Sequence, residues 1–140
     1  MAIQTSVTNR SNRLADPAAA TAELFAILEA DGRYDAPTGE LSVVFLSDPE
    51  IAALHERYLG DATPTDVITF PPQPEFDSAG EIFVSADHAA DRAGEFGTSF
   101  ADELTLYLVH GWLHLLGHTD KTPEDRAHMR EAETEALRLL

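Results

Sequence analysis

Cysteine, positive charge and long apolar runs are all scarce in this chain of 140 residues. The absence of cysteine excludes disulfides and thiolate ligands, so any bound zinc must use histidine and carboxylate side chains. No run of about 18 apolar residues is present that would span a membrane. The opening segment, MAIQTSVTNRSNRL, also lacks the apolar stretch of a signal peptide. We therefore expect a cytoplasmic protein without a membrane partner.

The shortage of positive charge is pronounced. Lys and Arg number 9 against 25 Asp and Glu, which gives a net charge of −16 at pH 7. Such a surface repels phosphate at long range, so a nucleic-acid partner would have to be bound locally, near a metal ion or by a few arginines. The excess lies in residues 22–109, whereas residues 110–140 are nearly balanced. The same acidity is also typical of a surface that merely keeps a protein soluble.

Composition and patterning predict one domain over residues 1–140. Apolar residues make up 44% of the chain and charged residues 24%, as in globular proteins. Runs of strand formers predict strands at residues 3–8, 41–46, 65–70 and 81–85, the last two forming a hairpin. Capping residues and helical patterning predict helices near 17–30, 48–59, 86–96, 100–116 and 122–139, with Asp16, Ser47 and Ser99 as caps of the first, second and fourth. We expect an α+β fold with one small, mostly antiparallel or mixed sheet of about four strands, packed with about five helices.

The run HGWLHLLGHTD at residues 110–120 has the spacing of a metal site. His110 and His114 lie four residues apart, so both project from one side of a helix. Gly117 can adopt the left-handed conformation that ends a helix, and the chain can then bring Asp120 back to the two imidazoles. Three protein ligands with a place for water are typical of a catalytic zinc site. We predict one zinc ion bound by His110, His114 and Asp120 on a central buried helix.

Two alternatives to this ligand set remain. The histidines can be ordinary core residues, although burying two imidazoles is costly unless each finds a partner. His118 competes with Asp120 as third ligand, but a helix continuing to His118 would place it roughly 11 Å from His110. That separation is too large for one ion, so we favour Asp120 and expect His118 at the rim.

The same helix argues against a protease. Zinc proteases with two helical histidines carry a glutamate directly after the first one, as the general base. Gly111 occupies that position in this chain. The remaining spacing still suits a metal ion that activates water or polarises a phosphoryl oxygen.

These motifs resemble the YbeY family of bacterial metal-dependent endoribonucleases, which act in ribosomal RNA maturation. The resemblance covers roughly residues 41–140 and rests on HGWLHLLG at 110–117, PTDVITFP at 64–71, GEI at 80–82, and Met129 and Glu133 in the closing helix. It implies a zinc-dependent endoribonuclease that acts on single-stranded regions of ribosomal RNA precursors, with the ribosome or ribosomal proteins as further partners. No DNA partner is expected.

Two departures from the family pattern bear on activity. The family motif ends in G-Y-D-H with histidine as third ligand, whereas this chain has Asp120 there, and an anionic ligand makes the metal less electrophilic. The family also carries an arginine in a Y-R-G segment, where this chain has Leu59. These departures favour an alternative function: a ribosome-assembly binding protein that keeps the metal-bound fold but has little catalysis. Thr65 and Asp66 either support a ligating imidazole or cap local amides.

Overall fold

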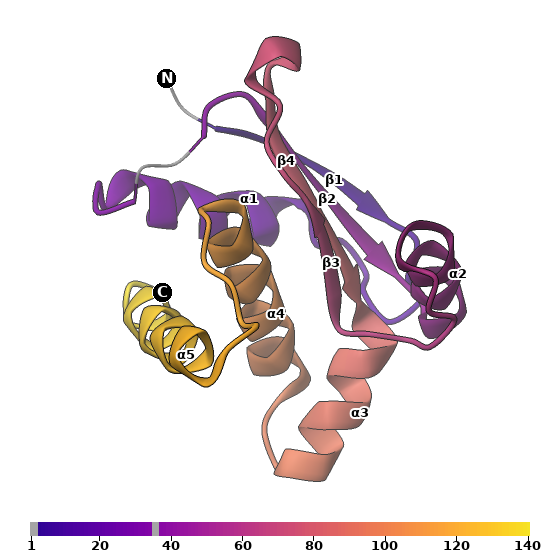
Figure 1. Ribbon diagram of the computed structural model, residues 1–140. Coiled ribbons are helices and arrows are strands. Elements are labelled where there is room, and N and C mark those ends of the chain that lie inside the picture. Colours follow the sequence, from indigo (N-terminus) through magenta and orange to yellow (C-terminus); the bar gives the residue numbers. More distant parts are fainter. Residues whose placement is uncertain (1–2, 35–36) are drawn as a thin grey trace.

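The chain forms one mixed sheet with helices on both of its faces (Figure 1). A computed structural model describes residues 3–34 and 37–140. Within these residues it contains five α-helices, four strands and a 3₁₀ turn, which confirms the predicted α+β class. In chain order they are β1 (Gln4–Asn9), α1 (Ala18–Ala30), β2 (Glu40–Leu46), α2 (Asp48–Leu59), β3 (Val67–Phe70), η1 (Pro74–Phe76), β4 (Ser78–Ser85), α3 (Ala86–Phe96), α4 (Phe100–Leu115) and α5 (Pro123–Arg138).

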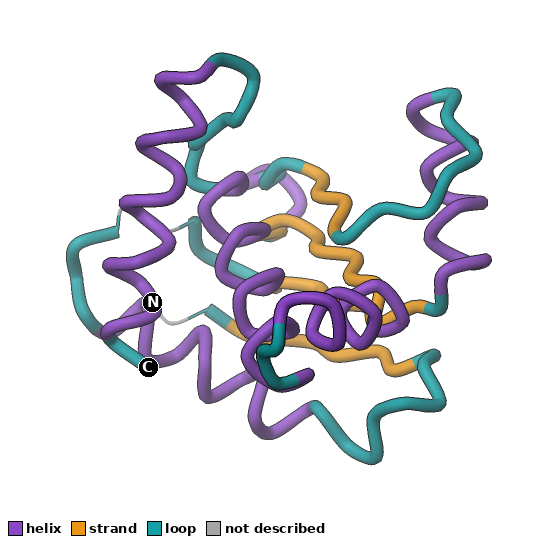
Figure 2. The backbone as a smooth tube through the Cα atoms, turned by 90° about the horizontal axis from the view of Figure 1, so that it is seen from below, coloured by secondary structure: helices purple, strands orange, loops and turns teal. Residues whose placement is uncertain are grey.

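The strand order in the sheet is β1-β2-β4-β3. Strand β2 pairs in parallel with β1 and β4, and β3 is antiparallel to β4, so the sheet is mixed. Figure 2 shows the strands side by side. Strand β4 begins at Ser78, three residues before the predicted start. A shift in register leaves Ala79 without a partner on β2, and Gly80 has a φ of 113°. The bulge explains the difference, because a short segment of Ser, Ala and Gly carries little strand propensity.

The two faces of the sheet are covered unequally. Alternate residues of β2, Leu41, Val43 and Phe45, face the larger core, which α1, α4 and α5 close. The opposite face carries Leu46 and packs against Ile51 of α2 in a smaller cluster. In Figure 1, α2 accordingly lies on one side of the strands and α1, α4 and α5 lie on the other.

Two predicted helix starts are confirmed and one is wrong. Ser47 Oγ accepts a hydrogen bond from the Glu50 amide as the cap of α2, and Ser99 Oγ accepts one from the Asp102 amide at 3.0 Å as the cap of α4. Helix α1, however, begins after Pro17 without a side-chain cap, not at Asp16. In the described part of the chain, no helix is both long and apolar enough to cross a lipid bilayer.

Helix α4 approaches the sheet very closely, and glycine permits it. A Cβ on Gly111 would lie 2.8 Å from Cγ2 of Ile82 and 3.3 Å from Cγ2 of Val67. A Cβ on Gly80 would lie 2.8 Å from Cδ2 of Leu115. A glutamate therefore has no room at position 111, where a zinc protease carries its general base.

We expect Gly111→Ala to lower the free energy of unfolding by about 1–3 kcal/mol, because the added methyl group forces β4 or α4 to move. Gly94→Ala is the matched control. Gly94 lies within α3, and a Cβ there would meet nothing within 4 Å. The control should gain about 0.5–1 kcal/mol from the higher helix propensity of alanine. Urea unfolding of both variants measures the difference, and equal stabilities would contradict the close approach.

Candidate metal centre

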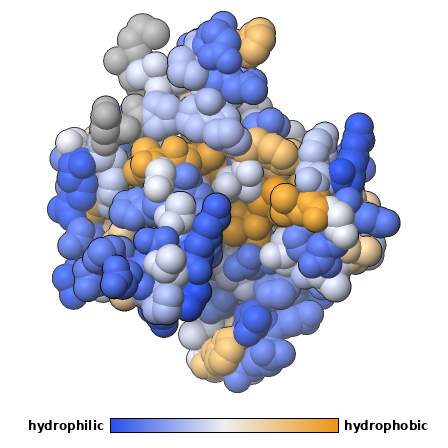
Figure 3. All heavy atoms as spheres, in the orientation of Figure 1, coloured by the Kyte–Doolittle hydropathy of each residue, from blue (hydrophilic) through white to orange (hydrophobic). Residues whose placement is uncertain are grey.

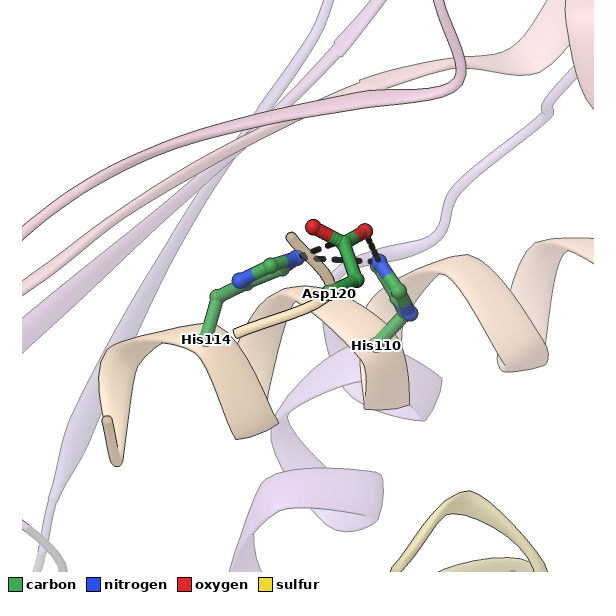
Figure 4. Close-up of side chains that lie close together, drawn as sticks. All are labelled: His110, His114 and Asp120. Atoms are coloured by element: carbon green, nitrogen blue, oxygen red, sulfur yellow. Dashed lines mark hydrogen bonds and ion pairs between the residues drawn. The ribbon is translucent and has the colours of Figure 1, made fainter. Parts of the chain in front are cut away.

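Two imidazoles from α4 and one carboxylate from the following loop form the centre of the site (Figure 4). His110 and His114 lie one turn apart on α4, and both are half-buried. Beyond Leu115 the chain turns sharply at Gly117, which has a φ of 102°. The Gly117 amide donates to the His114 carbonyl at 3.1 Å, and the His118 amide donates to the Leu113 carbonyl at 3.0 Å. This pair of bonds is the glycine-dependent helix ending that the spacing predicted.

The reversal brings Asp120 against both rings. Nε2 of His110 and Nε2 of His114 lie 3.0 Å apart. Oδ2 of Asp120 lies 3.6 Å from the first and 3.8 Å from the second. Among the described residues, the potential ligand atoms that gather within 4.8 Å of one another come from these three side chains. His118 follows the turn and is not part of this group.

The geometry suits a small divalent ion. A tetrahedral ion with bonds of about 2.0–2.1 Å separates its ligand atoms by roughly 3.3 Å. The three observed separations bracket that value. Three nitrogen and oxygen donors also leave a coordination position free, which a catalytic metal requires. The group can therefore hold a metal ion and expose it to a substrate.

Glu133 on α5 supports the first imidazole. Its Oε2 accepts a hydrogen bond from Nδ1 of His110 at 3.3 Å, and its side chain is 14% exposed. This contact leaves Nε2 of His110 free to face Asp120 and His114. Burial disfavours the protonated ring, but the hydrogen bond and charge of Glu133 more than offset it, so the pKa of His110 is raised. Glu133 was expected in the closing helix from the sequence, but its contact with His110 was not.

His114 differs from its neighbour in its electrostatic surroundings. Burial, followed by the positive charge of a protonated His110, lowers the pKa of His114. The nearby Asp120 acts in the opposite direction but does not reverse the shift. The surroundings of the two rings thus shift their pKa values in opposite directions.

Asp66 hydrogen-bonds locally rather than to an imidazole. Its Oδ1 accepts from the Val67 amide at 2.7 Å and from Thr65 Oγ1 at 3.3 Å. Its charge nevertheless helps to raise the pKa of His110, where it acts after Glu133. Of the two interpretations open from the sequence, capping of local amides agrees with these contacts.

Neither Leu59, at the position of the arginine in the family pattern, nor Arg57 belongs to the group of candidate ligands. Leu59, the last residue of α2, is 66% exposed and carries no charge. The guanidinium of Arg57 lies 5.4 Å from the centre of the Tyr58 ring. Arg57 lines a groove with Val44 and Phe83, which is separate from the histidine pair.

A small hollow adjoins the candidate ligands on the side of α5. It has a volume of about 280 Å³, and its lining is formed by His110, Asp120, Arg126, Met129, Arg130 and Glu133. A larger hollow of about 410 Å³ lies between α1 and α4, but its walls are mainly apolar and include none of the three candidate ligands. The smaller hollow is therefore the better candidate for a substrate-binding site, because candidate ligands form part of its wall. The face seen in Figure 3 is mostly hydrophilic, with apolar side chains gathered in a few patches.

Comparisons with known proteins agree with the motifs. The family model described as endoribonuclease YbeY matches residues 5–140. A relative from Bacteroides thetaiotaomicron, named endoribonuclease YbeY, is 38% identical over 104 residues, which cover 74% of this chain and 76% of the relative. A relative of the same name from Rhodopirellula baltica is 39% identical over 105 residues, which cover 73% of this chain and 54% of the relative.

A solved structure extends the agreement to the fold. The solution structure of a protein from Thermotoga maritima superposes with a TM-score of 0.68 at 27% sequence identity, over 97% of this chain and 88% of the other. The family match begins at residue 5 and therefore extends beyond residues 41–140, to which the resemblance in sequence was confined. The chain belongs to the endoribonuclease YbeY family.

Proposed function

We propose that this protein is a zinc-dependent endoribonuclease that cleaves single-stranded RNA in ribosomal RNA maturation and ribosome assembly. The observation that carries the proposal is the convergence of His110, His114 and Asp120 in a chain of the YbeY family. Its partners are ribosomal RNA precursors and the ribosome or its proteins, in the cytoplasm. The domain spans residues 1–140 and holds one zinc ion per chain.

Zinc suits the donor set better than a harder cation. Two imidazole nitrogens and one carboxylate oxygen are a common zinc set, whereas magnesium and calcium prefer oxygen ligands alone. A zinc ion at this position supplies Lewis acidity toward a phosphoryl oxygen or toward water. Glu133 holds His110 in the tautomer that presents Nε2, and the turn at Gly117 holds Asp120 in reach.

The second candidate is a ribosome-assembly binding protein that keeps the metal-bound fold with little catalysis. Three observations favour it. Leu59 replaces a cation, Asp120 adds negative charge to the metal ligands, and the chain carries a net charge of −16. All three oppose stabilisation of a phosphodiester transition state, which gains negative charge.

The ligand set predicts about one zinc ion per purified chain. His114→Ala and Asp120→Ala should each lose most of it, because two remaining ligands bind weakly. His118→Ala should retain it, since that side chain lies outside the group. Elemental analysis of the three variants beside wild type is the measurement. If His118→Ala loses zinc and Asp120→Ala keeps it, the assignment of the third ligand is wrong.

Removing the charge of Glu133 should weaken zinc binding without removing a ligand. We expect Glu133→Gln to lower the affinity for zinc about 10–100-fold, because the partner of His110 Nδ1 becomes neutral. Glu131→Gln is the matched control, since Glu131 is an exposed residue of the same helix. Competition with a chromophoric chelator measures both affinities. Equal affinities in the two variants would show that Glu133 does not support the site.

Cleavage of labelled single-stranded RNA separates the two candidate functions. An endoribonuclease cuts the strand, loses activity with a chelator and regains it with added zinc, whereas a binding protein only retains the strand. We expect Asp120→His to cleave faster than wild type at equal zinc content, because a neutral third ligand leaves the metal more electrophilic. His114→Ala serves as the inactive control. Retention of RNA without cleavage by wild type and Asp120→His would favour the binding protein.

A further inference from the structure

We propose that Arg126 and Arg130 of α5 form the phosphate-binding subsite of this metal centre, in place of the cation missing at Leu59. The inference rests on the proposed function, because it assigns these residues to the RNA strand that the site would cleave. Both arginines line the small hollow that also contains His110, Asp120 and Glu133. A phosphate in that hollow would lie beside the metal ligands.

The spacing of α5 explains why these residues share one surface. Arg126, Arg130 and Glu133 follow one another at intervals of four and three residues, so they form a stripe along the helix. Met129 and Ala136 beside this stripe are buried. Glu133 reaches His110 from the stripe, and the two exposed arginines along it line the hollow beside the same imidazole.

The other arginines with recorded contacts are engaged elsewhere. Arg10 pairs with Glu50, and Arg13 pairs with Asp87, each at 2.6 Å. Arg33 pairs with Asp31 and, at 3.8 Å, with Glu135. Arg57 and Arg92 make cation–π contacts with the rings of Tyr58 and Phe96, and Arg92 Nε also donates a hydrogen bond to His88 Nε2 at 3.4 Å. These five guanidinium groups already have partners within the protein and are therefore less available to an anionic substrate.

Arg126 and Arg130 retain donors for an anion. Arg126 Nη1 donates to the carbonyls of Asp120 at 3.3 Å and Lys121 at 3.5 Å, which leaves its other N–H groups available. Over residues 3–34 and 37–140, no carboxylate lies within 4.0 Å of the Arg130 guanidinium. Guanidinium groups bind phosphate through paired N–H donors, which suits these two side chains.

The size of the hollow limits what it would hold. Its volume of about 280 Å³ is just below the range of about 300–1,000 Å³ for sites that enclose a small molecule. A hollow of this size on an open surface suits one phosphate of a longer strand. In a chain of net charge −16, two such contacts near the metal supply the local attraction that the overall surface does not.

The experiment measures binding separately from cleavage. The probe is a short fluorescein-labelled 2′-O-methyl RNA strand, titrated by anisotropy at several salt concentrations against zinc-loaded protein. Arg126→Gln and Arg130→Gln should each weaken binding about tenfold, as expected for the loss of a charge-assisted hydrogen bond. The double variant should lower the slope of log affinity against log salt by about 1.4, since each single-strand phosphate contact contributes roughly 0.7.

Controls distinguish a phosphate contact from a structural role. Arg138→Gln removes the same charge from the last turn of α5, outside the hollow, and should bind as wild type does. Arg130→Lys should recover part of the affinity, because it restores the charge without the paired donors. Zinc content and melting temperature should stay at wild-type values in the glutamine variants. Loss of zinc in Arg126→Gln would mean that Arg126 only holds the Asp120 loop, which overturns its assignment.

Two further outcomes separate this inference from the proposed function. If wild type cleaves RNA and the double variant keeps the affinity and salt slope of wild type, the phosphate subsite is wrong and the proposed function stands. If zinc-loaded wild type neither binds nor cleaves single-stranded RNA, both are overturned. Reduced affinity and salt slope in the double variant, with Arg138→Gln unchanged, support the subsite.

Discussion

Helix α4 has to bury most of its surface while holding two imidazoles at a site that a substrate can reach, and the surrounding structure follows from that constraint. Glycine at positions 80 and 111 lets the helix lie almost in backbone contact with the sheet. On another side, Trp112 is fully buried and packs against the Phe25 ring, with ring centres 5.5 Å apart. Because the helix is fixed on both sides, His110 and His114 are held in a constant orientation.

The side chains of the candidate metal centre are positioned by different structural features. The two histidines depend only on helical geometry, and Asp120 depends on the turn at Gly117. Glu133 reaches the same site from α5 because its helix packs against α4. Half-buried imidazoles without partners would destabilise the fold, so the neighbouring carboxylates contribute to stability, and a metal ion held by this group would add to it.

The net negative charge of this protein determines where on its surface RNA could bind. The net charge of −16 acts over the whole surface, but salt screens it beyond about 8–10 Å. Contacts inside the site are shielded much less. A metal ion with two adjacent guanidinium groups can therefore bind phosphate locally although the protein as a whole repels it. Such an arrangement favours strands that enter the site over polyanions that meet the remaining surface.

Several features were predictable from the sequence, because each depends on residues within a few positions of one another. They are the α+β class, the order of elements, the helix caps at Ser47 and Ser99, and the turn at Gly117. Three other features were not predictable from the sequence. They are the bulge at Gly80, the contact between Glu133 and His110, and the hollow that Arg126 and Arg130 share. Each of these depends on which face of one element packs against another that is distant along the chain. Local spacing, with the turn at Gly117, determined the candidate ligands from the sequence alone, whereas only the tertiary packing of α5 on α4 decided which charged side chains surround them.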